Sequence, residues 1–152
     1  MVDIDLDKLT YEAVVIQNEL AQARDEVVKP IMAALLKRGY CTQDQFALRL
    51  GLEEAITNAY RHGNACDPTR RIHVRWSIDE ALAVIRVADE GRGFNPSRIP
   101  DPRKAENREK PSGRGVMLMR AYMTDLRFTG CGNEVCLIKA RKKSNRSSRR
   151  VH

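Results

Sequence analysis

Apolar residues recur every three or four positions through the first part of the chain. Between Thr10 and Arg38 the repeating positions are Ile16, Leu20, Ala23, Val27, Ile31 and Leu35. This spacing predicts an amphipathic helix with one buried stripe. Pro30 interrupts the pattern, and a proline ring clashes with the preceding helical turn, so we expect either a kink or two abutting helices. Gly39 is placed to end this helical region, and a short strand is expected at residues 3–6.

A second helical segment is predicted from Thr42 to His62. Thr42 and Gln45 have the spacing of a capping box, in which two side chains bond the free N–H groups at a helix start. Gly63 follows the last helical position, where glycine commonly ends a helix in a left-handed turn. The sequence therefore marks both ends of this segment.

Four shorter runs of apolar or alternating residues predict strands. They are residues 71–78, 82–89, 125–130 and 133–140, and each consecutive pair is close enough in sequence to form a β-hairpin. Residues 115–123, between the two hairpins, regain helical character. Helices followed by a hairpin, a helix and a second hairpin favour an α+β fold. We expect a two-layer sandwich whose mixed, mostly antiparallel sheet is covered on one face by helices.

Three polar residues stand at four-residue steps in the second predicted helix: Glu54, Asn58 and His62. On a helical wheel of about 100° per residue they lie on one line beside the apolar face, whereas Glu53 falls on the far side. Side chains at such a border are held by packing and can still be reached by a ligand. A solvated polar helix edge is the alternative explanation of the same pattern.

Asp89 ends an apolar strand and is followed by Gly91 and Gly93. Its carboxylate is a hydrogen-bond acceptor at the edge of the core. Glycines at the next positions let the backbone bend sharply and pass close to a flat ligand. An acidic turn after a strand would leave the same pattern, so this motif alone does not decide between a site and a turn.

A second glycine pair, Gly113 and Gly115 on either side of Arg114, leads into the helix predicted at 115–123. Bare backbone N–H groups at a helix start bind anions such as phosphate. A flexible loop entering a helix is the alternative explanation. The chain has no P-loop, dinucleotide-binding, protein-kinase or zinc-protease motif, so a nucleotide site in this chain would belong to another class.

The chain of 152 residues, 42% of them hydrophobic, has the size of one domain. It contains no apolar run long enough for a membrane span and no export signal at its N-terminus, so we expect a cytoplasmic protein. The four cysteines are scattered without the spacing of a metal site. We expect them to be buried, reduced thiols.

Much of the net charge of +7 comes from residues 141–152, which hold six of the 27 basic residues and no acidic residue. The remaining 21 basic residues nearly balance the 20 acidic residues of the chain. We therefore predict one domain at 1–140 and a basic, disordered tail at 141–152. Nucleic-acid binding is not expected, except as an unspecific contact of this tail.

Three motifs follow one another in order: E-x-x-x-N-x-x-x-H from Glu54, D-x-G-x-G from Asp89, and G-x-G from Gly113 before a helix. Together they resemble the N, G1 and G2 boxes of the GHKL ATPase superfamily. The stretch EEAITNAYRHG and the short chain look most like the stand-alone anti-sigma-factor serine kinases of bacteria. The resemblance covers residues 10–140 and implies the Bergerat type of two-layer sandwich.

The resemblance also implies roles for the motif residues. Asn58 would bind Mg²⁺ through its amide oxygen, and Glu54 would be the general base of phosphoryl transfer. Asp89 would accept a hydrogen bond from the adenine amino group of ATP. Gly91 and Gly93 would let the chain pass the adenine ring.

Gly113, Arg114 and Gly115 would line the ATP phosphates, below a lid formed by the segment between the two glycine motifs. That lid has an excess of basic residues, with Arg98, Arg103, Lys104, Arg108, Lys110 and Arg114 against Asp101, Glu106 and Glu109. His62 would have a structural or supporting role. The chain departs from the family pattern at Arg114, where an apolar residue is usual, and at Asn133, where a threonine is expected near the phosphates.

The activity implied by the resemblance is that of an ATP- and Mg²⁺-dependent serine kinase. It would phosphorylate a STAS-type anti-anti-sigma protein and sequester a sigma factor, and family members are commonly homodimers. A nucleotide-gated binding adaptor without phosphotransfer is the first alternative. A detached histidine-kinase ATPase domain is the second, although it would need a phosphoacceptor histidine and the first predicted helix contains no histidine.

Overall fold

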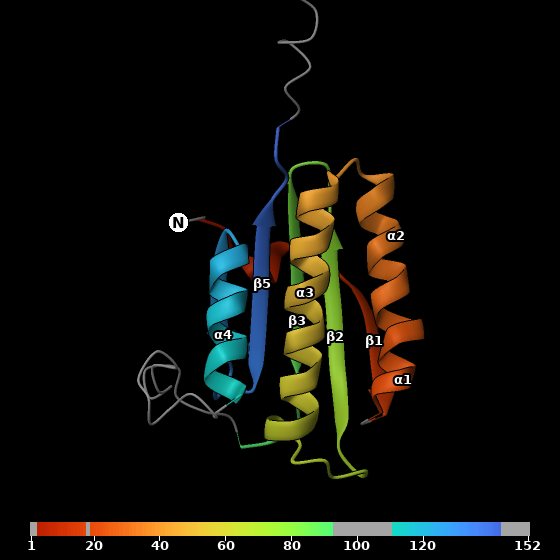
Figure 1. The fold of residues 1–152 in the computed structure, drawn as a ribbon, viewed down its shortest axis with the longest axis vertical. Helices are drawn as coiled ribbons and strands as arrows, with labels where there is room; N and C mark the ends of the chain where they lie inside the picture. The colour runs from red at the N-terminus through yellow and green to blue at the C-terminus, as the bar shows by residue number, and fades with distance from the viewer. Residues whose placement is uncertain (1–2, 18, 93–110, 144–152) are drawn as a thin grey trace, which may run out of the picture.

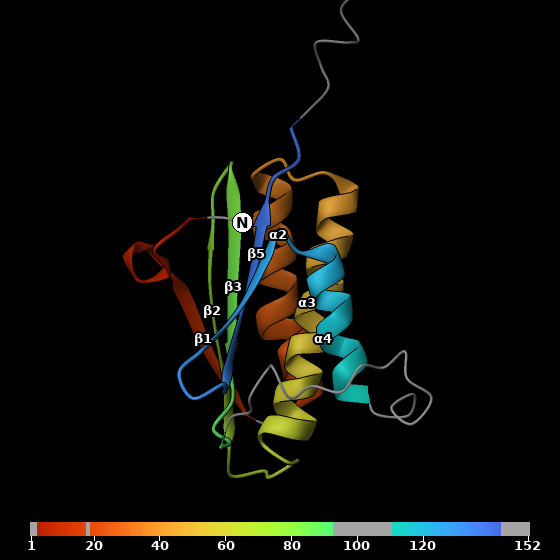
Figure 2. The same cartoon turned by 90° about the vertical axis from the view of Figure 1, so that its left-hand side faces the viewer.

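The structure, a computed structural model, describes residues 3–17, 19–92 and 111–143, and for 111–114 it describes the backbone alone. Helices form one layer and a five-stranded sheet forms the other (Figures 1 and 2). The elements in chain order are η1 (Leu6–Lys8), β1 (Glu12–Gln17), α1 (Leu20–Ala23), η2 (Arg24–Val28), α2 (Lys29–Lys37), α3 (Thr42–Asn58), η3 (Ala59–Gly63), β2 (Arg71–Ile78), β3 (Leu82–Ala88), α4 (Pro111–Tyr122), β4 (Asp125–Thr129) and β5 (Glu134–Ala140).

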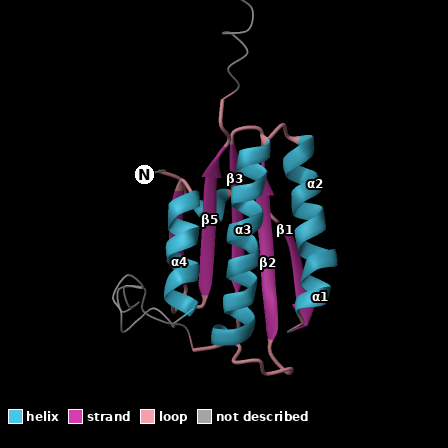
Figure 3. Ribbon diagram, in the orientation of Figure 1, coloured by secondary structure: helices cyan, strands magenta, loops and turns pink. Residues whose placement is uncertain are grey.

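The sheet has the strand order β1-β2-β3-β5-β4. Every pairing between its strands in the described ranges is antiparallel, so the sheet there is not mixed as predicted. β2 and β3 form the first predicted hairpin, and β4 and β5 form the second. In the second hairpin the turn contains Gly130 (φ +62°) and Gly132 (φ +88°), both in the left-handed region. The helices cover one face of the sheet (Figure 3), so the predicted α+β two-layer sandwich is confirmed.

The helix predicted from Thr10 is wrong over its first part, because Glu12–Gln17 form the edge strand β1. The run of β-branched residues that ends at Ile16 prefers an extended backbone. Ile16 fits a helical stripe by its spacing, but it is buried from the strand, where it pairs with Ile72 of β2. The strand expected at 3–6 is also wrong, since the chain there leads into the 3₁₀ turn η1.

Pro30 is accommodated by a wider helical turn. The five residues of η2 form a π-helix, and Lys29 has helical backbone angles and donates its N–H to the carbonyl of Arg24. A π turn re-spaces the carbonyls that a proline ring would otherwise meet in the preceding turn. The helical backbone therefore passes from α1 through η2 into α2. Of the predicted stripe, Ala23, Val27, Ile31 and Leu35 are buried, whereas Leu20 at the start of α1 is exposed, so the prediction is wrong at that position.

Gly39 ends α2 as predicted. It has a φ of +80°, and its N–H donates to the carbonyl of Leu36 at 3.2 Å. The N–H of Tyr40 donates to the carbonyl of Leu35 at 3.0 Å. This pair of bonds is a Schellman motif, which satisfies the last carbonyls of the helix and requires the left-handed residue.

The capping box predicted at Thr42 is wrong by one position, since Thr42 is already helical and Cys41 is the N-cap. The Cys41 Sγ accepts from the N–H of Asp44 at 3.5 Å. Gln45 does not close a box with Thr42, because its Nε2 donates to the carbonyl of Tyr40 at 2.8 Å. The helix start is thus set by its contacts with the preceding turn.

The far end of this helix also differs from its prediction. After Asn58 the chain continues into the π-helix η3, which ends at Gly63. Gly63 is not left-handed; the left-handed positions are Ala65 (φ 52°) and Cys66 (φ 56°). A glycine at position 63 therefore has another cause, which lies in the candidate site described below.

α3 runs along the middle of the helical layer, over the centre of the sheet (Figure 1). Its inner residues Leu48, Leu52, Ala55 and Ile56 are buried in the main core. At Gly51 an added Cβ would lie 3.2 Å from Met123 and 3.6 Å from Leu137. The missing side chain lets α3 approach the end of α4 and strand β5 closely, and this sets the spacing of the helices that carry the motifs.

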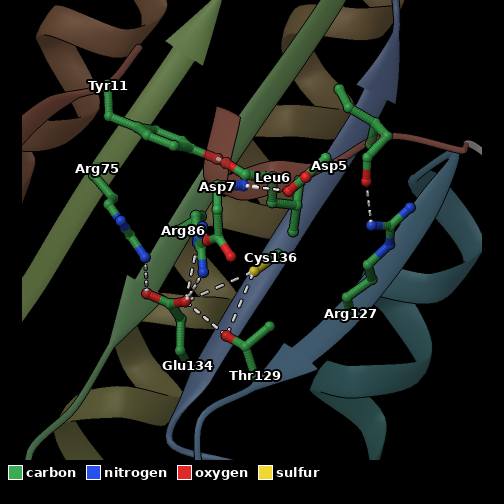
Figure 4. Close-up of polar contacts among 11 residues, drawn as sticks. Asp5, Leu6, Asp7, Tyr11, Arg75, Arg86, Arg127, Thr129, Glu134 and Cys136 are labelled. Atoms are coloured by element: carbon green, nitrogen blue, oxygen red, sulfur yellow. Dashed lines mark hydrogen bonds and ion pairs between the residues drawn. The ribbon is translucent and has the colours of Figure 1, made fainter. Parts of the chain in front are cut away.

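The opposite face of the sheet is partly covered by the N-terminal segment, residues 3–11 (Figure 2). Leu6 packs there in a small apolar cluster with Val84, Cys136 and Ile138. The Arg127 Nη1 donates to the carbonyl of Ile4 at 2.9 Å and holds the start of the segment against β4 (Figure 4).

A buried ion pair lies under the same segment (Figure 4). The Arg86 side chain is 5% exposed, and its Nη2 lies 2.6 Å from the Oε1 of Glu134. Thr129 donates its hydroxyl to the same oxygen at 2.6 Å. The Tyr11 ring lies over the guanidinium groups of Arg75 and Arg86. Burial raises the pKa of Glu134, but the bonds from Thr129 and Arg86 outweigh it and hold that pKa below its ordinary value.

The described end of the chain is bonded to the body of the protein. The N–H of Arg141 donates to the carbonyl of Ala81, and the N–H of Lys142 donates to the Oδ2 of Asp44 at 2.8 Å. The predicted tail therefore begins with two docked residues, while 144–152 lie outside the described residues. The domain boundary after Ala140 stays a prediction. Among the described helices, none has the length and apolarity that a membrane crossing requires.

All four cysteines are free thiols. Cys136 is buried and Cys41 is half-buried, but Cys66 and Cys131 are exposed. The expectation of buried thiols is wrong for these two, because both lie in turns outside the regular elements rather than in the core.

Replacing Glu134 by glutamine should lower the free energy of unfolding by about 3 kcal/mol, because the buried charge of Arg86 would keep only the exposed carboxylate of Asp7 as an acidic partner. Glu80→Gln is the matched control. It removes an exposed partner of Arg38 and should cost less than about 1 kcal/mol. Urea unfolding at neutral pH measures both effects, and equal effects would contradict the assignment.

The effect of Glu134→Gln should also depend on pH. Because the folded pKa of Glu134 is lowered, its stabilisation is fully present above the ordinary carboxyl pKa and is lost as the pH falls through the lowered pKa. The difference between wild type and variant should therefore shrink in acid. A difference in stability that grows in acid would show that the pKa of Glu134 is raised and not lowered.

Candidate functional site

Glu54 and Asn58 lie on adjacent turns of α3 and are both half-buried, as the helical pattern predicts. Glu53 points to solvent, where its carboxylate pairs with Arg49 at 3.1 Å. Within the described ranges, no hydrogen bond is formed by the Glu54 carboxylate or the Asn58 side-chain amide. One carboxylate and one amide are thus held by the packed helix and remain available to a ligand.

α4 begins earlier than predicted, at Pro111. Gly113 lies in its first turn and Gly115 follows in the second, so the two glycines are not in a loop before the helix. A helical start at Pro111 is favoured because proline lacks an N–H and already has a helical φ. The backbone N–H groups of the first turn have no partner within the helix, so the anion binding predicted for this segment would fall at the first turn of α4 and stays a prediction.

Gly115 brings α4 against the two polar residues of α3. A Cβ added at Gly115 would lie 2.8 Å from the Oε2 of Glu54 and 3.1 Å from the Nδ2 of Asn58. Both distances are tighter than ordinary contacts of a real Cβ. The glycine therefore leaves the space in which the two side-chain ends meet the start of α4, and the structure joins the first and third motifs.

The second motif is joined to the end of the same helix through Asp89. Its Oδ1 accepts from the N–H of Gly91 at 2.8 Å. A Cβ at Gly63 would lie 2.1 Å from the Oδ2 of Asp89, and a Cβ at Gly91 would lie 2.0 Å from the carbonyl oxygen of Gly63. No side chain fits at either position. Gly63 is therefore required by the approach of Asp89 and not by a left-handed turn.

Burial raises the pKa of the Asp89 carboxyl above its ordinary value, although the Gly91 N–H and the positive charge of Arg70 act in the opposite direction. A raised carboxyl pKa means that folding favours the protonated form. Stability linked to Asp89 is therefore largest below the ordinary carboxyl pKa and falls as the pH rises through the raised value. A half-buried acceptor with this cost is typical of a residue kept for binding rather than for stability.

Two asparagines that the sequence did not single out as site residues hold the backbone around Asp89. Asn64 is fully buried; its Oδ1 accepts from the N–H of Glu90 at 2.8 Å, and its Nδ2 donates to the carbonyl of Arg71 at 3.0 Å. Asn133 donates its Nδ2 to the carbonyl of Asp89 at 2.9 Å. The sequence noted Asn133 only as a departure from a family pattern. The bonds from Asn64 to Glu90 and from Asn133 to Asp89 join segments far apart in the chain.

The structure does not test every predicted site residue. Gly93 and the predicted lid residues 98–110 lie outside the described residues, as does the side chain of Arg114. His62, the third residue of the polar line, lies in η3 and is exposed. The residues that the structure brings together are therefore Glu54, Asn58 and Gly115 on one side, and Asp89, Gly91 and Gly63 on the other.

The side-chain oxygens at this site are of the type that binds a magnesium ion together with phosphate. Among the described residues no group of three His, Cys, Asp or Glu side chains could hold a metal ion. Mg²⁺ needs no such cage, because it binds through one or two protein oxygens and keeps waters and phosphate oxygens as its other ligands. The amide of Asn58 and the carboxylate of Glu54 supply oxygens of this type beside the first turns of α4.

The chain is similar to proteins of one family. The family described as "Histidine kinase-like ATPase domain" matches residues 16–139. The serine-protein kinase RsbW of Bacillus licheniformis is 32% identical over 100 residues, which cover 60% of this chain and 61% of that protein. An anti-sigma F factor of Clostridium perfringens is 30% identical over 102 residues, which cover 64% of this chain and 71% of that protein.

A solved structure has a similar fold. The crystal structure of the RsbU and RsbW domains of a Mycobacterium tuberculosis protein matches with a TM-score of 0.61 at 18% identity. The match covers 89% of this chain and 34% of that chain. At this identity the likeness establishes the fold alone.

Replacing Gly115 by alanine should displace the ends of Glu54 and Asn58 without unfolding the protein. Alanine is favoured over glycine inside a helix by about 1 kcal/mol, so urea unfolding should find the variant no less stable than wild type. The side-chain amide signals of Asn58 in a nitrogen–proton NMR spectrum should move. Gly51→Ala is the control, because its Cβ would meet core residues instead. Unmoved Asn58 signals in Gly115→Ala would contradict this site.

Proposed function

Because this chain belongs to the histidine kinase-like ATPase family, we propose that it binds ATP with Mg²⁺ and acts as an anti-sigma-factor serine kinase. Its substrate would be a serine of a STAS-type anti-anti-sigma protein, and its other partner a sigma factor that it sequesters. Two similar proteins support this proposal by their names, one a serine-protein kinase and the other an anti-sigma F factor. The chain spans 61% of the length of the first, so the activity and both partners are proposals.

The base of ATP would be recognised by Asp89. Its carboxylate is acceptor-only and held by the N–H of Gly91, which suits a purine amino group that donates a hydrogen bond. Gly63 and Gly91 keep this place free of side chains. Gly93 would extend the same passage beside the adenine ring.

The triphosphate would lie at the start of α4. The free N–H groups of a first helical turn favour anions, and Gly113, Arg114 and Gly115 would line the phosphates there. The basic excess of the segment before this helix, residues 98–110, would add favourable charge for a triphosphate or for an acidic partner.

Glu54 and Asn58 would carry the chemistry. Bound Mg²⁺ would neutralise charge on the phosphates, and the Asn58 amide oxygen would hold it there. Glu54 would orient the serine hydroxyl of the protein substrate and accept its proton as the oxygen attacks the terminal phosphorus, while the bond from that phosphorus to the bridging oxygen breaks and ADP leaves. Phosphoryl transfer depends mainly on positioning and charge, so a rigid helix that holds both residues is a suitable support.

One observation carries the proposal: the side chain missing at Gly115 leaves the start of α4 against both Glu54 and Asn58. It joins the proposed base and metal ligand to a helix start suited to phosphate. The other end of the same polar line, at Gly63, meets the proposed adenine acceptor. ATP has its phosphates at one end and its adenine amino group, a hydrogen-bond donor, at the other, which matches the order of these two places along the helix.

Two alternatives share the same site. A nucleotide-gated adaptor would bind ATP and a regulator without transferring phosphate. A detached histidine-kinase ATPase domain would need a phosphoacceptor histidine on a dimerising helix, whereas the histidines of the described ranges are His62 in η3 and His73 in β2. A sigma-factor partner would place the protein in the cytoplasm as a regulator of transcription. We also propose a homodimer, from the family resemblance alone.

Phosphotransfer separates the kinase from the adaptor. The purified protein is incubated with Mg²⁺ and ATP labelled on its terminal phosphate, together with candidate STAS proteins. The kinase proposal predicts label on a serine of one STAS protein, and a partner with its serines replaced by alanine is the control. Tight nucleotide binding with every partner unlabelled would favour the adaptor.

Glu54→Ala and Asn58→Ala should fail in different ways. Glu54→Ala should bind ATP within a fewfold of wild type and slow phosphotransfer by about 100-fold or more, because only the base is removed. Asn58→Ala should lose the part of ATP affinity that depends on Mg²⁺. Calorimetric titration with and without Mg²⁺, together with single-turnover transfer, measures both. Glu53→Ala is the matched control on the exposed side, and wild-type behaviour of Glu54→Ala would contradict the role of Glu54.

Asp89→Asn should change which purine is bound. The amide oxygen must face the N–H of Gly91, so the NH₂ group would take the place of Oδ2 and meet the ligand as a donor. ATP should bind about 10- to 100-fold more weakly, while ITP, which has a carbonyl in place of the amino group, should gain affinity. Calorimetric titration measures both. An equal loss of affinity for ATP and ITP would argue against base recognition by Asp89.

A further inference from the structure

We propose that Asn133 is a positioning residue that holds Asp89 for purine recognition, and that it thereby sets the preference for adenine. The inference rests on the proposed function, since it concerns the same nucleotide. Asn133 lies in the turn between β4 and β5, whereas Asp89 follows β3, so 44 residues of chain separate them.

Both main-chain hydrogen-bonding groups of Asp89 are bonded to this one residue. The N–H of Asp89 donates to the carbonyl oxygen of Asn133 at 2.9 Å. The carbonyl oxygen of Asp89 accepts from the Nδ2 of Asn133, also at 2.9 Å. The two peptide groups that flank the Asp89 side chain are therefore fixed from the same direction, and the direction of the side chain is fixed with them.

The side chain of Asn133 continues the sheet by one residue beyond its regular end. The ladder between β3 and β5 ends at the pair Ala88 and Glu134. Past this pair the N–H of Asp89 is still bonded to Asn133, but in the part of the chain that the structure describes no backbone N–H donates to the carbonyl of Asp89. The Asn133 amide supplies that donor, so Asp89 keeps an ordered backbone after the strand has ended.

The orientation of the Asn133 amide is fixed by its other contacts. Its Oδ1 accepts from the thiol of Cys131 at 3.6 Å, so the NH₂ group faces the carbonyl of Asp89. A Cβ at Gly130 would lie 2.7 Å from the same Oδ1. The glycine of the turn therefore leaves room for the amide, and the conformation of the β4–β5 turn is linked to the position of Asp89.

The carboxylate of Asp89 has little freedom when its backbone is held in this way. Its Oδ1 is bonded to Gly91, its Oδ2 lies against Gly63, and the next N–H, of Glu90, is held by Asn64. A hydrogen bond to a purine amino group discriminates only if its acceptor is held in place, because a mobile carboxylate can turn away from a wrong base. Loss of the Asn133 donor should therefore reduce discrimination more than it reduces triphosphate binding.

Asn133→Asp tests this donor with a side chain of the same shape. The aspartate oxygen cannot donate to the carbonyl of Asp89. Its added charge acts on all triphosphates alike, so it cancels in the ratio of ITP to ATP dissociation constants. Asn133→Ala, which adds no charge, is the second variant in case the first does not fold. Cys131→Ser is the matched control, because it alters the same turn without removing the bond to Asp89.

Calorimetric titration of the full chain with ATP and ITP, each with Mg²⁺, should give a wild-type ratio in favour of ATP. The ratio should fall about tenfold in Asn133→Asp and Asn133→Ala and stay within about twofold in Cys131→Ser. Thermal unfolding checks that the variants are folded. A variant in which both nucleotides weaken equally, or in which the ratio is unchanged, overturns the role of Asn133 while leaving the proposed function intact. A wild type that binds neither nucleotide overturns both.

Discussion

Close approach of backbone to side chain, at glycines where an added Cβ would meet a polar side chain, is the constraint on which the candidate site depends. Gly115 lets the start of α4 reach Glu54 and Asn58, and Gly63 lets the end of the long helix reach Asp89. Each contact joins segments that are distant in sequence. With a side chain at either position, the polar groups of α3 would be separated from the segments that complete the site.

The predictions that held are those that depend on the periodicity of the chain or on local turns. The 3.6-residue repeat placed Glu54 and Asn58 at the border of the buried face and Glu53 in solvent, and the structure agrees. Alternating strands and local turns predicted both hairpins and the two-layer sandwich. Gly39 was correctly placed because a helix end of this type is a local event, formed by bonds within six residues.

The predictions that failed depend on competition between local patterns or on contacts across the fold. Ile16 fits a helical stripe by its spacing, but the β-branched run that it ends prefers a strand, and this run pairs with β2. Gly63 looked like a helix stop, but its cause is Asp89, 26 residues away. Asn64 gave no signal and Asn133 was noted only as a departure from the family pattern, since each bonds a backbone group that the fold brings near from a distant part of the chain.

The central claim is that one nucleotide contacts the elements joined by these glycines. Nitrogen–proton NMR of the labelled chain during titration with ATP and Mg²⁺ tests it most directly. The account predicts that the backbone signals of Gly63, Gly91 and Gly115 and the side-chain amide of Asn58 move together and saturate at one ATP per chain. Signals that stay in place at saturating ATP, or that move at Gly115 but not at Gly63 and Gly91, would contradict it.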